Sequence, residues 1–241
     1  MTSAQIIDLW ERGRSQNIAE RADLLLQLAF PQASKVELLR LTVGQRDSVL
    51  LRLRELTFGP TLSCVGECPD CLALGEREIG IASLLGEPPP NPGRVDFLFD
   101  QDGFQIRFRP LRGTDLHLLR RARDSEAARH ALMACIIGSC SRNGTEVEFK
   151  RLPDHILDDL AEAVADSDPQ SEVWVGIECP ECGAEFDAIL DIMDFFWREI
   201  AAEARRTQAE VEYLVRAYGW SAPKVLNMSG ERRRLYMEAA A

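Results

Sequence analysis

Two pairs of cysteines with almost the same local sequence lie far apart in this chain. Each pair reads Cys-Pro-acid-Cys, as CPDC at 68–71 and as CPEC at 179–182. Two thiolates two residues apart on a tight turn can hold one edge of a metal ion's coordination shell, and the proline presets the backbone of that turn. Two such pairs supply four sulfurs, which complete the tetrahedral shell that zinc prefers. We therefore predict a structural zinc site formed by Cys68, Cys71, Cys179 and Cys182.

Other roles for the cysteines stay open at this point. A thioredoxin-like dithiol also contains a CxxC motif, but its first cysteine lies at the N-terminus of a helix, where the dipole lowers the thiol pKa. Half-sites that bridge two chains, and turns that hold no metal, are further alternatives. Cys64 could replace a ligand, although a buried strand thiol is its simpler role. Cys135 and Cys140 lie in the apolar segment LMACIIGSC, where we expect them to pack in a helix core.

No other residues form a recognisable catalytic constellation. His117, His130 and His155 stand singly on helical patterns, without the spacing of an HExxH motif. The chain has no G-x-S-x-G elbow, Walker loop or Rossmann glycine fingerprint. Four sulfurs around zinc leave no open position for water, so the metal would serve as scaffold. The sequence predicts a protein that is not an enzyme.

The elements that must position the cysteines are short strands. TLSCVGE and REIGIAS flank the first pair, and SEVWVGI and AEFDAILD flank the second. A CxxC turn between two strands is the pattern of a zinc knuckle, and neither knuckle can close a four-sulfur site alone. The repetition is therefore explained if the second knuckle returns to the first, as the two halves of a zinc ribbon do.

About 107 residues separate the two pairs, far more than the roughly 12–20 of a compact zinc ribbon. The proline-rich segment at 86–93 predicts a linker, because three consecutive prolines cannot continue a helix or a central strand. We predict that an inserted subdomain splits the ribbon, with the metal and strand pairing holding its ends. A structural zinc ion can supply roughly 10 kcal/mol or more, which offsets the entropy of closing so long a loop.

The insertion itself predicts both strands and helices. RVDFLFD and FQIRFRP alternate apolar and polar residues around the turn DQDG, which indicates a hairpin. A helix is expected from Thr114 to about Ser139, with a break near Ser125, and another at 152–168. The short strand TEVEF lies between these two helices.

Helices are also predicted at both ends of the chain. The first sixty residues are expected to be helical, with one helix starting at Asn17 and another over TVGQRDSVLLRLRELTFG, which ends at Gly59. The tail from Asp191 to Tyr218 predicts one helix about 42 Å long, followed by a short terminal helix. Along the long helix, residues recur at alternating steps of four and three, as in a coiled-coil seam. They are Met193, Trp197, Ile200, Ala204, Thr207, Val211, Leu214 and Tyr218. Packing on the protein's own helices is the favoured interpretation of this stripe, and docking of another chain through the 191–218 helix is the alternative.

The overall charge limits the kinds of partner. The chain has 241 residues and a formal net charge of −11, without the clustered Lys and Arg that broad contact with nucleic acid phosphates requires. We interpret its basic stretches, which are Arg120, Arg121 and Arg123 and the segment ERRR at 231–234, as solvated faces. No segment approaches the roughly 20 apolar residues of a membrane span, and the N-terminus has no apolar run of signal-peptide length. We therefore expect a soluble, cytoplasmic protein that binds no nucleic acid.

Three stretches of the sequence also carry a family resemblance. They are LTVGQRDSVLLRLRELTFGPTL followed by CPDC, then DPQSEVWVGIECPECGAEF, and finally VRAYGWSAPKVLNMSGERRRLYMEAA. Together they resemble the baseplate proteins of T-even-like contractile phage tails, which have relatives in phage-derived contractile injection systems. The similarity covers about residues 40–85 and 165–241, and its more distinctive parts are Gly44 to Asp47 and Tyr218-Gly219-Trp220.

The resemblance implies a non-enzymatic part in building or completing the baseplate hub. The protein would bind other baseplate, hub or tube subunits, either in the cytoplasm during assembly or within the assembled contractile tail particle. A zinc-ribbon adaptor for transcription or nucleic-acid machinery is the alternative function, and a dithiol oxidoreductase is a third.

In fold class we predict an α+β protein with a split zinc ribbon and an inserted α/β subdomain. The predicted parts are an N-terminal helical region (1–59), the first half of the ribbon (60–85), the inserted hairpin-plus-helices subdomain (94–171), the second half of the ribbon (172–190), and the long C-terminal helix with a terminal helix (191–241).

Overall fold

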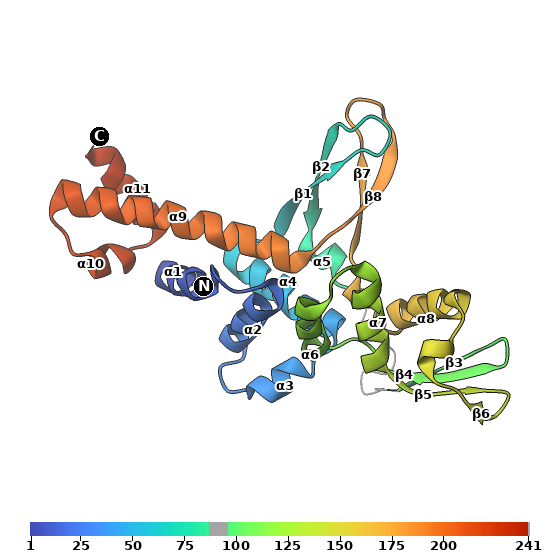
Figure 1. Cartoon of the computed structure of the whole chain (residues 1–241). Coiled ribbons are helices and arrows are strands. Elements are labelled where there is room, and N and C mark those ends of the chain that lie inside the picture. The colour runs from blue at the N-terminus through green and yellow to red at the C-terminus, as the bar shows by residue number, and fades with distance from the viewer. Residues whose placement is uncertain (87–95, 241) are drawn as a thin grey trace.

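The computed structural model describes residues 1–86 and 96–240, with the side chains of Arg120 and Arg121 also left out. The linker predicted at 86–93 therefore lies almost entirely outside the described residues. Figure 1 shows three parts: a body of helices from both ends of the chain, an arm of two β-hairpins that projects from it, and a lobe formed by the residues between the hairpins. Helices and small sheets together make the mixed architecture that the sequence predicts.

The N-terminal half of the body consists of four helices that each start at a capping box. They are α1 (Ser3–Gly13), α2 (Ile18–Ala29), α3 (Lys35–Leu39) and α4 (Val43–Phe58). In each, a Thr, Asn or Ser side chain accepts a hydrogen bond from the backbone N–H three residues later, and the Gln or Glu there bonds back to the cap. α4 ends at Gly59, whose φ of 101° suits glycine. The helices predicted to start at Asn17 and to end at Gly59 are confirmed.

The C-terminal half of the body is built on the long helix α9 (Ile192–Tyr218), as predicted. Six of the eight residues in its stripe are buried, and α9 packs against α1, α2 and α4 and against the two short helices that follow it, α10 (Ala222–Leu226) and α11 (Gly230–Ala239). Internal packing of most of the stripe is therefore confirmed, and docking of another chain through this helix stays a prediction. None of the helices within the described ranges is long and apolar enough to cross a membrane.

The Tyr218-Gly219-Trp220 segment turns the chain back at the end of α9. Gly219 has a φ of 66°, the left-handed conformation of a helix C-cap, and its N–H donates to the carbonyl of Val215. The Tyr218 ring stacks on Trp220 with centroids 4.5 Å apart, and the Tyr236 ring of α11 contacts both edge-on. This aromatic cluster holds the terminal helix against α9.

The interpretation of ERRR at 231–234 as a solvated face is wrong for one of its residues. Arg233 is 1% exposed, and its Nε donates to Glu210 of α9 at 2.7 Å. Its other nitrogens donate to the Met228 carbonyl at 2.8 Å and to Ser3 Oγ at 3.1 Å. The buried guanidinium thus connects both ends of the chain to the long helix, while its neighbours Arg232 and Arg234 are exposed.

The arm consists of two antiparallel hairpins. β1 (Thr61–Glu67) pairs with β2 (Leu74–Gly80), and β7 (Trp174–Glu178) pairs with β8 (Glu185–Ile189). The predicted strand REIGIAS is partly wrong, because β2 starts earlier, at Leu74, and Ile81–Leu84 forms the short helix α5. Ile81 and Leu84, at the two ends of α5, are both buried in the body's core. In a continuing strand, residues three positions apart would point to opposite faces, so one of them would be directed away from the core.

The inner faces of the two hairpins touch through glycine. A Cβ on Gly75 would lie 2.7 Å from Ile177 Cγ2, and one on Gly66 would lie 3.0 Å from both Ile177 and Phe186. Two glycines on the first hairpin therefore let the larger side chains of the second pack directly against its backbone. This close approach brings the two hairpin tips together.

The lobe contains a sheet with strand order β3-β4-β5-β6. Its strands are β3 (Phe97–Gln101), β4 (Phe104–Phe108), β5 (Ile137–Arg142) and β6 (Thr145–Glu146). Both of its two-residue turns, Asp102-Gly103 and Asn143-Gly144, have positive φ at each position, as a type I′ hairpin turn requires. The hairpin predicted around DQDG is confirmed, and the predicted strand TEVEF is present only as its first two residues.

The helices of the lobe cover this sheet and complete a second core. They are α6 (Gly113–Leu116), η1 (His117–Arg121), α7 (Ser125–Ile136), η2 (Phe149–Arg151), α8 (Asp154–Ser167) and η3 (Pro169–Ser171). The break near Ser125 and the helix at 152–168 are confirmed. The helix predicted to reach Ser139 is wrong beyond Ile136, because the chain there pairs with β4 as strand β5. Cys140 is therefore buried from a strand rather than a helix, and Cys135 is half-buried at the end of α7.

The described residues form two hydrophobic clusters. One is shared by the body and the base of the arm, and the other belongs to the lobe, with Ile106, Ile156 and Leu160 at 0% exposure. This separation agrees with an inserted subdomain, although the residue boundaries of the domains stay a prediction.

The lobe is fastened to the body at a junction where two distant segments meet. The Gly44 N–H, in the first turn of α4, donates to Asp168 Oδ2 at 2.8 Å. Gln170, on η3, donates to the Leu84 carbonyl at 3.0 Å and accepts from the Gly86 N–H at 2.6 Å. The start and the end of the insertion are thus held side by side. Two of the stretches quoted for the family resemblance, around Gly44 and around Asp168, contact each other here.

Candidate metal centre

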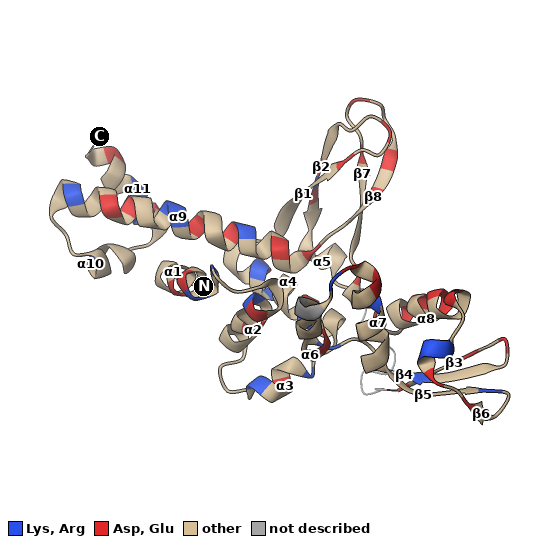
Figure 2. Ribbon diagram, viewed as in Figure 1, with Lys and Arg blue, Asp and Glu red and all other residues tan. Residues whose placement is uncertain are grey.

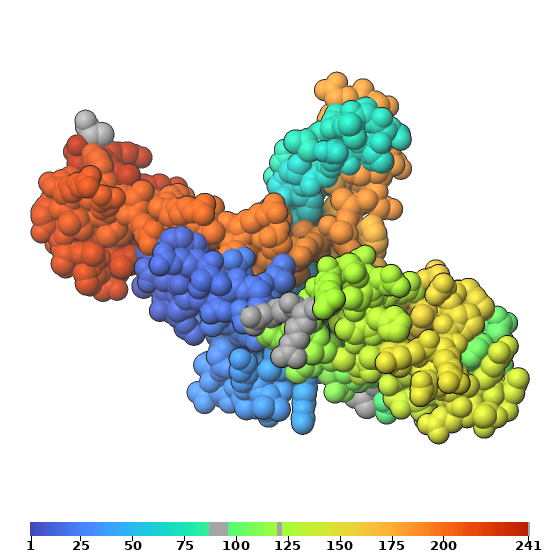
Figure 3. All heavy atoms as spheres, viewed as in Figure 1, coloured from blue at the N-terminus to red at the C-terminus, as the bar shows by residue number. Residues whose placement is uncertain are grey.

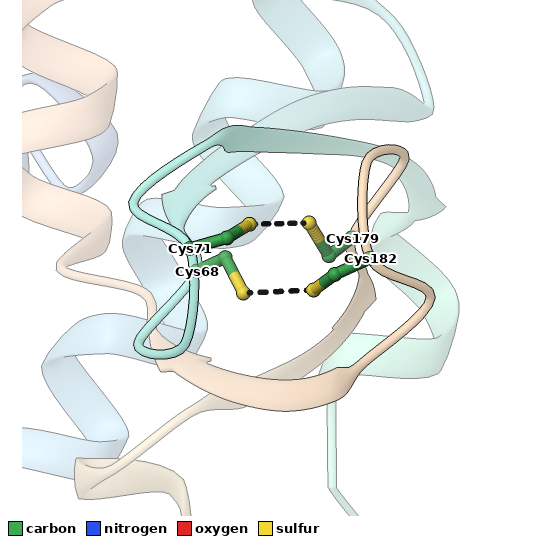
Figure 4. A group of neighbouring side chains, drawn as sticks. All are labelled: Cys68, Cys71, Cys179 and Cys182. Atoms are coloured by element: carbon green, nitrogen blue, oxygen red, sulfur yellow. Dashed lines mark hydrogen bonds between the residues drawn. The ribbon is translucent and has the colours of Figure 1, made fainter.

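The four predicted ligands lie together at the tip of the arm (Figure 4). Their sulfur atoms all lie within 4.8 Å of one another, with Cys68 Sγ 3.7 Å from Cys182 Sγ and Cys71 Sγ 3.5 Å from Cys179 Sγ. Each hairpin contributes one pair from the turn between its strands. Within the described part of the chain, this is the one group of His, Cys, Asp or Glu side chains placed to share a metal ion.

The two turns have the same backbone design. In the first, the Cys68 N–H donates to the Ala73 carbonyl and the Leu72 N–H donates to the Cys68 carbonyl, both at 2.9 Å. In the second, the Cys179 N–H donates to Ala184 at 2.9 Å and the Gly183 N–H donates to Cys179 at 3.0 Å. The residue after each pair has a positive φ, which is 72° at Gly183 and 62° at Leu72. The first turn therefore places a leucine where the second places glycine.

The spacing of the sulfurs fits zinc. A tetrahedral site with zinc–sulfur bonds of about 2.3 Å has sulfur–sulfur edges of about 3.8 Å, close to the two measured separations. The same separations are far above the roughly 2.05 Å of a disulfide bond, and all seven cysteines are free. Cys68 and Cys179 are buried, whereas Cys71 and Cys182 face solvent. The residues present would thus fit a closed four-sulfur zinc site.

The thiols influence one another's ionisation. Backbone N–H groups of Cys182 and Glu181, together with the neighbouring thiols, lower the pKa of Cys179 to about 7. The backbone at Ala73 lowers the pKa of Cys71, but the neighbouring sulfurs raise it more, to about 12. One thiolate is therefore favoured, and a second beside it is not, because like charges oppose each other. A divalent cation would remove this opposition and allow all four to ionise.

The remaining cysteines and histidines take no part in this cluster. Cys64 lies buried on β1 within the body's core, where burial raises its thiol pKa, so it is not positioned as a replacement ligand. His117 lies 3.2 Å from Asp23, His155 lies 3.5 Å from Asp102, and the His130 ring lies 5.3 Å from the Phe149 ring at an angle of 51°. The cysteine pairs occupy turns between antiparallel strands, which differs from the helix N-terminus that a thioredoxin-like dithiol requires.

The arm that carries the cysteines is strongly acidic (Figure 2). Its two segments, 61–80 and 174–189, contain eight carboxylate residues and one basic residue, Arg77. The Arg77 guanidinium donates to the Gly176 carbonyl, across the two hairpins. The sequence analysis missed that most of the chain's net charge gathers on one projecting element, although the segments could have been counted once the hairpins were predicted. Such a surface is unsuited to binding phosphates.

Comparison with known families adds independent information. The model of a family described as T4 bacteriophage base plate protein matches residues 10–197. This range includes both cysteine pairs, the lobe and the start of α9, while the C-terminal residues 198–241 lie outside it. Searches of curated proteins and of solved structures found no match. Because the family match spans well over half of the 241 residues, the chain belongs to the T4 bacteriophage base plate protein family.

Proposed function

We propose that this protein is a non-enzymatic component or assembly factor of the baseplate in a contractile tail or contractile injection system. It acts by binding other baseplate subunits, and it holds one structural zinc ion through Cys68, Cys71, Cys179 and Cys182. The single observation that carries the baseplate role is the family match over residues 10–197. The lack of an open coordination position in a four-sulfur site supports a structural use of the metal.

The zinc ion would join two halves of one fold rather than supply chemistry. The four ligands come from two hairpins that are separated in sequence by the whole lobe. Residues of both hairpins also belong to the hydrophobic core of the body. A metal bound at the tip would hold the hairpins at the close approach that Gly66 and Gly75 permit. Metal binding and formation of the arm would then be one event.

The competing role as a nucleic-acid adaptor is disfavoured by charge. Zinc ribbons that contact nucleic acid need Lys and Arg on the exposed surface of the ribbon. The arm here offers one arginine against eight carboxylates. A polyanion would be repelled from the very element that an adaptor would use.

Zinc content tests the metal site. The purified chain should contain about one zinc ion, measured by inductively coupled plasma mass spectrometry, and the Cys68→Ser and Cys179→Ser variants should lose the metal and part of the fold together. Cys135→Ser is the matched control, because Cys135 lies outside the cluster and should leave zinc content unchanged. Normal zinc in either ligand variant would exclude the four-sulfur site.

A gentle pull-down of the tagged chain from its native host tests the baseplate role. Co-purification of tube, sheath, hub or spike subunits in fixed ratio, identified by mass spectrometry, is the expected result. Stoichiometric recovery from finished particles would mark a component, and recovery from precursors alone would mark an assembly factor. Recovery of polymerase or DNA-bound proteins in their place would overturn the proposal.

A further inference from the structure

A basic pocket lies on the body, in a chain whose net charge is −11. The pocket has a volume of about 370 Å³ and is formed by α1, α2 and the first half of α9. Its lining includes Trp10, Arg14, Arg21, Trp197, Arg198 and Arg205. We call it the Arg–Trp pocket. Four arginines around one small cavity contrast with the acidic character of the rest of the protein.

Part of this positive charge has no compensating carboxylate among the residues that the structure describes. Asp194 is the one carboxylate in the lining, and it pairs with Arg198 one turn later on α9. No carboxylate of the described residues lies within ion-pair distance of Arg14 or Arg205. Both of these side chains are exposed. The pocket therefore carries a surplus of three positive charges.

The aromatic walls of the pocket are held in position. The Arg21 guanidinium lies 4.7 Å from the centre of the Trp197 ring, and it donates to the carbonyls of Gly13 and Arg14. Arg14 lies 5.8 Å from the centre of the half-buried Trp10 ring. Arginine beside tryptophan is the composition typical of energetically important positions in protein interfaces. Guanidinium groups bind carboxylates with two parallel hydrogen bonds, so the pocket suits acidic side chains of a protein.

The arm carries the complementary surface. A groove of about 970 Å³ on the arm is lined by residues of both hairpins, among them Glu76, Glu178, Glu185 and Asp187, with Arg77 as its one basic residue. Glu178 lies directly opposite Glu185 in the β7–β8 ladder, where two like charges destabilise a hairpin. An incoming pair of arginines would relieve that repulsion.

The arm is well placed to reach another molecule. It rises away from α1 and α2 in Figure 1, and in Figure 3 its two hairpins stand clear of the body and the lobe. At 0.1 M salt the overall repulsion between two negative chains is screened beyond about 10 Å, whereas ion pairs formed at direct contact are screened less.

We propose that the Arg–Trp pocket binds the acidic arm of a second copy of this chain. Such a contact joins two different surfaces, so it is head-to-tail and produces a ring or an open chain of subunits. It does not depend on the baseplate role, because it follows from the charges of this chain alone.

Sedimentation velocity of the zinc-loaded full chain at 0.1 M salt tests the proposal. The wild type should associate in the micromolar range, and Arg14→Glu with Arg205→Glu should weaken association by about tenfold or more. The control pair is Arg107→Glu with Arg234→Glu, which changes the net charge equally at exposed positions outside the pocket and should associate like the wild type. Unchanged far-UV circular dichroism and zinc content will show that each variant is folded.

A mixing experiment identifies the arm as the occupant. Glu178→Gln with Glu185→Gln alters the arm alone, without making it complementary to the acidic pocket of the first variant, and should also weaken association. Mixed with the pocket variant, it should form a dimer containing one chain of each kind and nothing larger, because one intact pocket and one intact arm remain. Failure of this mixture to form a dimer, or a wild type that stays monomeric to about 100 µM, would overturn the proposal. A monomeric wild type that still co-purifies with baseplate subunits would refute self-association and leave the proposed function standing.

Discussion

Replacing Gly44 by alanine should destabilise the protein, although general helix rules predict the opposite. Gly44 lies in the first turn of α4 with ordinary helical surroundings, and alanine normally stabilises a helix relative to glycine by about 0.5–1 kcal/mol. The junction reverses this expectation. An added Cβ would lie 2.3 Å from Asp168 Oδ1, 2.8 Å from Asp168 Cγ and 3.0 Å from Gln170 Cβ.

The size of the effect follows from what must move. A contact at 2.3 Å cannot be accommodated, so the Asp168 carboxylate has to withdraw and its 2.8 Å bond from the Gly44 N–H is lost. A hydrogen bond to a charged group contributes about 1.5–3 kcal/mol. Subtracting the gain in helix propensity leaves a net loss of about 1–2 kcal/mol of unfolding free energy. Part of the cost should appear as looser attachment of the lobe.

Urea unfolding of the zinc-loaded protein measures this loss, followed by tryptophan fluorescence and by far-UV circular dichroism. All four tryptophans lie outside residues 94–171, so fluorescence reports the body and arm while dichroism also reports the lobe. Gly80→Ala is the control, because a Cβ there meets nothing within 4 Å. Once Asp168→Ala has removed the clashing carboxylate, adding Gly44→Ala should cost little more. A Gly44→Ala protein as stable as the wild type would refute the steric account of the junction.

Two further predictions concern buried ion pairs. Arg233→Ala leaves the buried Glu210 carboxylate without its partner, so it should lower the free energy of unfolding in urea by about 3–5 kcal/mol. The control Arg234→Ala changes an exposed neighbour and should stay within about 0.5 kcal/mol of the wild type. Equal losses in the two variants would refute the role of the buried pair. In the lobe, burial raises the pKa of Asp115, but the hydrogen bonds and charge of Arg109 lower it more, below its usual 3.8. The stability from this pair is therefore present above about pH 4 and is lost as the pH falls through the lowered pKa. The difference in unfolding free energy between the wild type and Asp115→Asn, followed by circular dichroism, should therefore shrink in acid. A difference that is constant from pH 7 to pH 3 would contradict this assignment.

The features that the sequence predicted well are those encoded over a few residues. A CPxC turn needs only its own four residues and the strands beside it, so both knuckles could be recognised separately and then paired by the chemistry of zinc. The helices starting after Asn17 and Thr42 were predictable because their capping residues and apolar spacing are local. The long helix was predictable for the same reason, from its period and from Gly219.

The features that escaped prediction depend on a partner far along the chain. The apolar run CIIGSC suits a helix or a buried strand equally well, and pairing with β4 decides in favour of the strand. Arg233 stands between two exposed arginines, so nothing local distinguishes it. Its burial depends on Glu210 and on Ser3 from the other end of the sequence. The Arg–Trp pocket is likewise assembled from three helices and has no signature in any one of them.

The junction and a zinc ion at the four cysteines would both hold the two hairpins together. Without the junction, zinc binding would have to close a loop of about 107 residues between Cys71 and Cys179. Once Gln170 holds Leu84 and Gly86, only about 20 residues remain free between the two cysteine pairs. Loop-closure entropy scales as about 1.5RT ln n, so this shortening lowers the cost of closure by about 1.5 kcal/mol, or about tenfold in zinc affinity. The contacts of Gln170 with Leu84 and Gly86, distant from every cysteine, would therefore favour metal binding by presenting the two hairpins to each other before zinc arrives.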